Sequence, residues 1–313
     1  MANDFNSLFL KRHNLRVNGQ GAASILTRRI MKIIIADSGS TKTTWTLSDP
    51  AGREIMLTSG INPFYQGEEE IFGMLEREFP EKPKGVEALY FYGAGCANEQ
   101  VNAIVRKALH RYFGVEAIEV QSDLMAAARA LCGHEPGIAC ILGTGSNSCY
   151  YDGQQIAAQV SPLGFILGDE GSGGVLGRTF LSDLLKNQLP APLVKAFYEV
   201  YPITPAEILN HIYKQPFPNR YAARFTRFMY DHRQEPAIRN LIMAQFSLFI
   251  ERNLLQYPAV RELPVQFCGS IAFYFSDYLT EALISHALTP GKMVQDPMEG
   301  LVAFHAHQGE ILR

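Results

Sequence analysis

The same short pattern, a strand followed by a glycine-rich turn and a second strand, occurs twice in this chain and limits its fold more than any other feature. The first copy is the apolar strand 32–36 with the turn Asp37-Ser38-Gly39-Ser40-Thr41. The second copy is the apolar strand 137–142 with the turn Gly143-Thr144-Gly145-Ser146-Asn147. In both copies a tight turn then leads into a third strand. Two copies that each open a section of similar size indicate a duplicated β-β-β-α-β unit.

Glycine turns of this kind have a chemical use. Consecutive backbone N–H groups exposed by a tight turn form a concave site for anions. Two facing turns could therefore hold a polyphosphate in a cleft between two lobes. Glycine turns are also common in ordinary hairpins, and the pattern alone is equally compatible with that interpretation.

Length and composition agree with a chain of two lobes. The 313 residues exceed one ordinary domain of ~100–200 residues. Hydrophobic residues make up 47% and charged residues 19% of the chain, which is enough apolar mass for two cores. Predicted strands such as 115–120 alternate with predicted helices such as 98–113, 124–131 and 175–187, so the fold class is α/β with mixed sheets.

The charge balance and the cysteines exclude several kinds of partner. The formal net charge of -3 provides neither a basic field for nucleic acid nor a polybasic stripe for a membrane surface. The richest apolar stretch, 241–250, is interrupted by Gln245, and a bilayer span needs ~20 apolar residues. The five cysteines include no C-x-x-C pair, so we expect reduced thiols in a cytoplasmic protein.

Residues 1–30 differ from the rest of the chain. They carry five basic residues against the single acid Asp4, and they show no sustained hydrophobic period. A disordered extension or a misassigned start is the plainer interpretation, because Met31 stands directly before the first strong strand. A transit peptide is the alternative, since such segments are basic and poor in acids.

Four motifs in a fixed order give the chain a specific resemblance. Residues 37–43 resemble the first phosphate-binding motif of the actin, hexokinase and Hsp70 superfamily, and 143–147 resemble the second. Residues 265–270 resemble its adenosine-contacting strand and turn. The phrase 168–174, Gly-Asp-Glu-Gly-Ser-Gly-Gly, narrows the resemblance to the BadF/BadG/BcrA/BcrD ATPase family and to its N-acetylglucosamine kinase-like members.

The resemblance implies a fold and an activity. The fold would have two actin-like (ribonuclease H-like) lobes with mixed five-stranded sheets and a nucleotide cleft between them. The first lobe would span 31–134 and be joined by a C-terminal helix within 293–313, and the second lobe would span 135–292. The activity would be ATP-dependent phosphorylation of an amino sugar, N-acetylglucosamine to its 6-phosphate, with ATP and Mg²⁺ as cofactors.

The resemblance also implies roles for individual residues. Asp37 would orient Mg²⁺ through water, and Asp123 would be the catalytic base. The residues expected at the nucleotide are Asp37, Gly39, Ser40, Thr41, Lys42, Gly143, Thr144, Gly145, Ser146, Gly269 and Ser270. The residues expected at the sugar are Asn62, Asp123, Thr144, Gly145, Asn147 and Asp169. Pro162-Leu163 departs from the glycine and tryptophan of the mammalian-type kinases, at the expected wall of the acyl-group pocket.

By residue chemistry alone the three aspartates have plainer interpretations. Asp37 follows a strand and would cap a turn, whereas Asp123 and Asp169 stand at helix starts, where carboxylates cap the first turn. A helix N-terminus should also lower the pKa of Asp123 and weaken it as a base. Phosphoryl transfer tolerates a weak base, because its loose transition state depends mainly on positioning and charge neutralisation.

Two other functions fit the same family and fold. One is an ATPase that activates a radical dehydratase and shares an iron–sulfur cluster across a dimer, which a colourless purified protein would contradict. The other is a nucleotide-binding sensor of amino sugars, which a coupled kinase assay would separate from a kinase. The partner expected from the main interpretation is a small-molecule sugar, and the sequence leaves a homodimer open.

Overall fold

The computed structural model describes residues 31–308 except 40–41, 50–51 and 80. The predicted extension 1–30, the turn residues Ser40 and Thr41, and residues 309–313 therefore lie outside the described residues. None of the described helices is long and apolar enough to span a membrane.

Two five-stranded sheets organise the chain, and both have the same topology. The first sheet has the order β3-β2-β1-β4-β5 and the second the order β10-β9-β6-β7-β8. The strands of the first are β1 (Ile33–Ser38), β2 (Lys42–Asp49), β3 (Gly52–Ser59), β4 (Ala88–Gly93) and β5 (Ala117–Ser122). Those of the second are β6 (Gly137–Leu142), β7 (Ser146–Tyr151), β8 (Ile156–Gln159), β9 (Val265–Cys268) and β10 (Pro290–Val294).

Matching strand pairs confirm the duplication. Strand β1 is antiparallel to β2 and parallel to β4, and β6 is likewise antiparallel to β7 and parallel to β9. The central strands β1 and β6 are almost wholly buried, as expected for strands covered on both faces. The predicted fold class, α/β with two lobes and mixed five-stranded sheets, is therefore confirmed.

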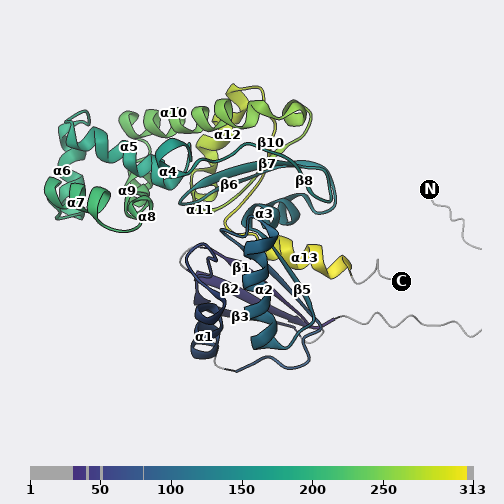
Figure 1. Cartoon of the computed structure of the whole chain (residues 1–313). Helices are drawn as coiled ribbons and strands as arrows, with labels where there is room; N and C mark the ends of the chain where they lie inside the picture. The colour runs from purple at the N-terminus through teal and green to yellow at the C-terminus, as the bar shows by residue number, and fades with distance from the viewer. Residues whose placement is uncertain (1–30, 40–41, 50–51, 80, 309–313) are drawn as a thin grey trace, which may run out of the picture.

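Helices cover the outer face of the first sheet and fill the space between the two sheets (Figure 1). The outer helices are α1 (Glu68–Glu78) and α2 (Glu99–Phe113), which bury Ile71, Val105 and Leu109 against the sheet. Between the sheets lie α3 (Asp123–Cys132) and α13 (Met298–Gln308), in a core shared by residues of β1, β4, β6 and β7. The chain thus returns to the first lobe at its C-terminal end.

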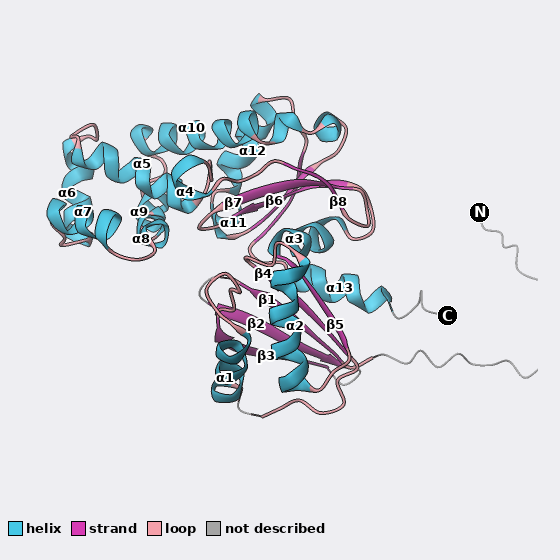
Figure 2. Ribbon diagram, viewed as in Figure 1, coloured by secondary structure: helices cyan, strands magenta, loops and turns pink. Residues whose placement is uncertain are grey.

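The remaining helices belong to the second lobe (Figure 2). They are α4 (Gly164–Leu167), α5 (Gly173–Leu185), α6 (Ala191–Val200), α7 (Pro205–Lys214), α8 (Pro218–Ala223), α9 (Thr226–Asp231), α10 (Pro236–Arg252), α11 (Ser270–Tyr274) and α12 (Ser276–Ser285), with 3-10 turns η1 (Leu254–Gln256) and η2 (Pro258–Arg261). Helices α7, α8 and α10 each begin at a proline, whose fixed φ and missing N–H suit the first helical turn.

Sequence patterns located several elements to within two residues, among them β1, α2 and β6, whereas β4 and α1 were not predicted. Helix α2 starts after Asn98, whose side chain accepts the N–H of Val101, and ends at Gly114, whose φ is 67°. The predicted strand 115–120 was placed two residues too early, since β5 spans Ala117–Ser122. The shift matters for the site, because Ser122 ends the strand and also caps α3.

Candidate active site

Three aspartates from three separate segments lie at the carboxyl ends of strands, and two of them act on the third. Asp37 is near the end of β1, Asp123 begins α3 directly after β5, and Asp296 lies between β10 and α13. Burial, then the charges of Asp123 and Asp296, raise the pKa of Asp37 to about 7, while Lys42 opposes the rise. Asp37 therefore lies in an excess of negative charge that a cation would relieve.

The arrangement of these carboxylates also limits how a cation could bind. Within the described part of the chain, no three carboxylate, imidazole or thiol groups are placed to hold one metal ion. Magnesium usually keeps several waters and binds through one or two carboxylates together with substrate phosphates. The surroundings of Asp37 fit a hydrated Mg²⁺ of that kind.

Asp123 is not the N-cap of its helix. The hydroxyl of Ser122 accepts the N–H of Met125 and fills that role. Asp123 Oδ1 accepts the N–H of Leu124 at 2.8 Å. The expectation that the helix N-terminus lowers the pKa of Asp123 was wrong: burial raises the pKa and outweighs the backbone hydrogen bonds that lower it. Because Asp123 is not the helix cap and its pKa is raised, its carboxylate is suited to accept a proton.

The second glycine turn is held by the start of α5. The N–H groups of Gly173 and Gly174 donate to the carbonyl oxygens of Gly143 and Thr144 at 2.8 and 3.0 Å. A β-carbon on Gly174 would lie 2.9 Å from the Thr144 oxygen, so this close approach requires glycine. The N–H of Gly143 also donates inside the turn, to Gly145. The Gly-Asp-Glu-Gly-Ser-Gly-Gly phrase thus shapes the second turn.

Asp169 is buried and faces this same turn. Burial raises its pKa to about 6, against the N–H of Ser146, which donates to the carboxylate, and Glu170 adds to the rise. Asp169 is in the left-handed region with φ of 56°, and its N–H donates to Pro162 at 3.0 Å. Ser172 caps α5, so the capping interpretation of Asp169 is wrong as well.

Asn62 lies beside a turn that sequence reasoning missed. Its Oδ1 accepts the N–H of Phe64 at 3.0 Å and would lie 2.5 Å from a β-carbon on Gly95. Gly95 belongs to the turn after β4, and the neighbouring Ala94 donates its N–H to the Ser38 oxygen at 3.0 Å. The sequence does contain a signal for this turn, because the small residues Gly93-Ala94-Gly95 stand at the end of a buried strand.

Several of the other predicted residues that the structure describes lie at the glycine turns and at the ends of strands. Gly39 donates its N–H to the Lys42 oxygen at 3.0 Å and closes the first hairpin. Asn147 Oδ1 accepts from Gln159 on the neighbouring strand at 3.1 Å, whereas Thr144 is exposed.

Gly269 and Ser270 follow β9, the strand that the resemblance predicted to contact adenosine. Gly269 has φ of 121°, and a β-carbon there would lie 2.3 Å from the Leu142 oxygen. Ser270 begins α11 and is exposed. Asp296 and Gly95 were not predicted at all.

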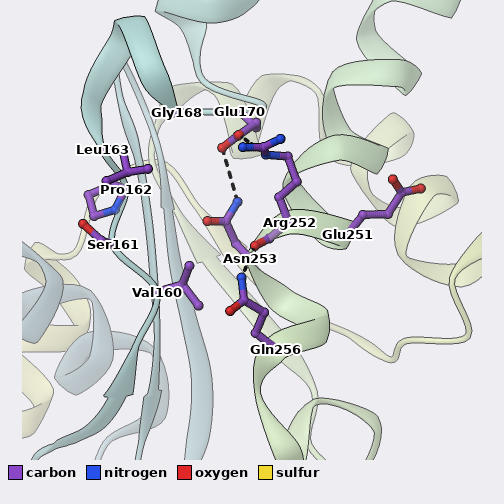
Figure 3. A pocket seen from close by; sticks show the side chains of 10 residues that line it. All are labelled: Val160, Ser161, Pro162, Leu163, Gly168, Glu170, Glu251, Arg252, Asn253 and Gln256. Atoms are coloured by element: carbon purple, nitrogen blue, oxygen red, sulfur yellow. Dashed lines mark hydrogen bonds and ion pairs between the residues drawn. The ribbon is translucent and has the colours of Figure 1, made fainter.

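A separate hollow of about 340 Å³ lies near Asp169 (Figure 3). It lies between residues 160–163 and the end of α10, and Pro162-Leu163 forms part of one wall. Glu170 pairs there with Arg252 at 2.5 Å and accepts from Asn253 at 3.4 Å. None of Asp37, Asp123 and Asp169 lines the hollow, so it is not the site of the carboxylate chemistry.

The cysteines are poorly placed for an iron–sulfur cluster shared between two chains. Four of the five are buried and Cys132 is half-buried. Burial raises the pKa of Cys96 and of Cys149 to about 12. Ligation requires thiolates, so these thiols do not favour the dehydratase-activating function.

Comparison with solved structures identifies the class of protein. The MreB5 protein of Spiroplasma citri bound to ADP has 12% identity, a TM-score of 0.55, and coverage of 91% of this chain and 99% of its own. A candidate N-acetylglucosamine kinase from Chromobacterium violaceum has 21% identity, a TM-score of 0.67, and coverage of 88% and 99%. The fold is that of the actin-like ATPases.

A third solved structure identifies the family. A candidate N-acetylglucosamine kinase from Porphyromonas gingivalis has 46% identity, a TM-score of 0.85, and coverage of 88% of this chain and 99% of its own. The chain belongs to this N-acetylglucosamine kinase-like family, as the four sequence motifs predicted. No protein-family model and no curated protein matches the chain.

Proposed function

We propose that this protein is an ATP-dependent sugar kinase that phosphorylates N-acetylglucosamine at its 6-hydroxyl. The observation that carries the proposal is the 46% identity to a candidate N-acetylglucosamine kinase over 99% of that chain. Two of the predicted aspartates, Asp123 and Asp169, support it, because Ser122 and Ser172 cap the helices that follow them. Asp37 and Asp123 come from the first lobe and Asp169 from the second.

ATP would bind between the two glycine turns. Similar folds have been solved with nucleotide, including MreB5 of Spiroplasma citri with ADP. Asp37 would hold Mg²⁺ through water, and a nearby cation would oppose the burial and the charges of Asp123 and Asp296 that raise its pKa. When bound, Mg²⁺ neutralises charge on the phosphates during transfer. Lys42, whose charge lowers the pKa of Asp37, would lie near the same phosphates.

Asp123 would orient the sugar hydroxyl in line with the γ-phosphoryl group and accept its proton. The O–P bond to the sugar forms as the bond between the γ-phosphorus and the β–γ bridging oxygen breaks, and ADP leaves. A base works best when its pKa lies near the working pH, so the pKa rise caused by burial helps Asp123. Asn62 and Asp169 would hold the other hydroxyls from opposite lobes.

An ADP-release assay with a sugar panel tests the proposal. The panel compares kcat/KM for N-acetylglucosamine, glucosamine, N-acetylmannosamine and glucose at saturating ATP, and phosphorus NMR locates the phosphate on the product. Sites built to bind a polar group reject analogues without it by up to ~10⁴-fold, so glucose should be much poorer than N-acetylglucosamine. Preference for glucose or glucosamine would refute the acetamide assignment, and no ADP release with any sugar would refute the kinase.

A further inference from the structure

Two aromatic side chains stand out on the loop between β3 and α1. Phe64 is 65% exposed and Tyr65 is 78% exposed, although both follow Asn62, a predicted sugar contact. Large aromatic side chains usually bury most of their area. The exposure of these two rings beside a candidate sugar contact therefore indicates that they pack against a bound molecule and not against the protein core.

The exposure is not a result of a loosely held loop. The Asn62 oxygen accepts the N–H groups of Tyr65 and Gln66 at 3.0 and 3.1 Å. The N–H of Asn62 donates to Gln66 Oε1 at 2.7 Å, and the N–H of Phe64 donates to Asn62 Oδ1 at 3.0 Å. The backbone is thus fixed around Asn62, and the Phe64 ring is presented from a well-defined turn.

The Phe64 ring lies next to the turn after β4. A β-carbon on Gly95 would lie 2.9 Å from Phe64 Cδ2 and 2.5 Å from Asn62 Oδ1, so the ring and the amide lie against the same small surface. Strand β4 is the parallel neighbour of β1, which carries Asp37, and of β5, which leads to Asp123. The ring therefore belongs to the same sheet edge as the two aspartates.

We propose that Phe64 is a specificity-determining residue of the sugar site, where its ring packs on the apolar C–H face of the pyranose. This inference rests on the proposed function. A pyranose with equatorial hydroxyls has flat faces of C–H groups, and an aromatic ring covers such a face with little loss of conformational entropy. An axial hydroxyl interrupts the face, so the ring selects gluco-configured sugars over epimers.

Substitution of Phe64 separates ring packing from the rest of catalysis. Phe64→Ala should raise KM for N-acetylglucosamine by roughly 2–12-fold, the range expected for one aromatic contact. The contact acts on substrate and transition state alike, so kcat should change less than about twofold. KM for ATP should not change. Phe64→Tyr and Phe64→Trp should keep the wild-type KM, and Phe64→Leu should behave like alanine because it lacks a flat ring.

A matched control is Tyr213→Ala on α7, which removes an aromatic side chain that is 79% exposed and should leave all constants unchanged. An unchanged sugar KM in Phe64→Ala, or a change of its oligomeric mass relative to wild type in light scattering, would overturn the inference and leave the kinase intact. Absence of sugar phosphorylation by the wild type would instead refute the proposed function. Calorimetric titration of the sugar then decides on Phe64, because absent binding by the wild type, or unaltered binding by the alanine variant, overturns its role.

Discussion

The carboxylate of Asp169 lies directly against Gly145, and its Oδ2 would be only 3.0 Å from a β-carbon on that glycine. The next residue of the turn, Ser146, donates its N–H to the same carboxylate. The second glycine turn and the predicted sugar contact Asp169 are therefore structurally coupled. A substitution in the turn that moves Asp169 should affect sugar binding as well as nucleotide binding.

Gly145→Ala tests this coupling. The φ of Gly145 is not in the left-handed region, so alanine fits the backbone, and we expect the free energy of unfolding to change by less than about 1 kcal/mol. The new methyl group would push Asp169 aside by a few tenths of an ångström, and kcat/KM for the sugar should fall by roughly 3–30-fold, less than the ~10²-fold that misplacement by about 1 Å can cost. Steady-state kinetics and urea denaturation measure the two effects.

Gly143→Ala is the matched control for that change. A β-carbon on Gly143 would meet nothing within 4 Å, so Asp169 should stay in place and KM for the sugar should stay near wild type. Equal increases in sugar KM for both variants would show that contact with Asp169 is not the cause.

Asp123→Asn tests the proton acceptor. The amide keeps the shape of the carboxylate but cannot take the proton, so kcat should fall by roughly 10²–10⁴-fold. ATP affinity measured by calorimetry should be unchanged. Ser122→Ala is the control, because it removes the helix cap and should cost about 1 kcal/mol of stability without a comparable loss of kcat. A parallel loss of ATP binding in Asp123→Asn would contradict the catalytic role.

Sequence patterns predicted those parts of the fold that depend on local periodicity and on turns. The buried strand 33–36 and the apolar face of α2 could be located because neighbouring residues carry the pattern. The N-terminal ends of α3 and α5 were ambiguous by one to three residues, since serine and aspartate are both good caps. Only the observed hydrogen bonds assign the caps to Ser122 and Ser172.

Contacts between residues that are far apart in the sequence could not be predicted from local patterns. Asp296 reaches the surroundings of Asp37 because β10 pairs with β9 and the chain then turns into α13, and nothing in the residues near Asp296 marks that return. The sign of the pKa shift of Asp123 was missed for a related reason. Burial of a side chain depends on the packed tertiary structure, and here it outweighs the local helix effect.

The raised pKa of Asp37 predicts a pH-dependent stability. The folded protein holds the proton to about pH 7, whereas the ordinary carboxyl loses it near 3.8. Between these values the folded state binds more protons than the unfolded chain, so the contribution of Asp37 to the free energy of unfolding falls as pH rises. Asp37→Asn has no carboxyl proton to lose, so its stability should not fall in this way. Without Mg²⁺, the Tm of the variant minus the Tm of wild type should therefore increase from pH 5 to pH 8.

Asp296→Asn serves as the control for the titration. The amide oxygen can still accept the N–H of Met298, as the carboxylate does at 3.1 Å, but one of the charges that raises the pKa of Asp37 is gone. The loss of stability should then occur at lower pH than in wild type. Identical pH profiles of Tm for wild type and Asp37→Asn would contradict the assignment to Asp37.

Gly300 tests how the C-terminal helix holds the catalytic helix. A β-carbon on Gly300 would lie 2.3 Å from the oxygen and 2.7 Å from the Cα of Ala130, so α13 and α3 pack backbone against backbone. Gly300→Ala should therefore destabilise the protein by roughly 1–3 kcal/mol, as overpacking usually does. It should also lower kcat, because α3 carries Asp123 at its start.

The same substitution on α1 should have the opposite effect on stability. A β-carbon on Gly73 would approach only the end of the flexible Arg77 side chain, at 3.4 Å, and alanine is favoured over glycine inside a helix by about 1 kcal/mol. Gly73→Ala should thus stabilise the protein in urea denaturation and leave kcat unchanged. If Gly300→Ala were also stabilising, α13 could not be packed on α3 as closely as the structure has it, and the position of Asp123 would have to depend on β5 and Ser122 alone.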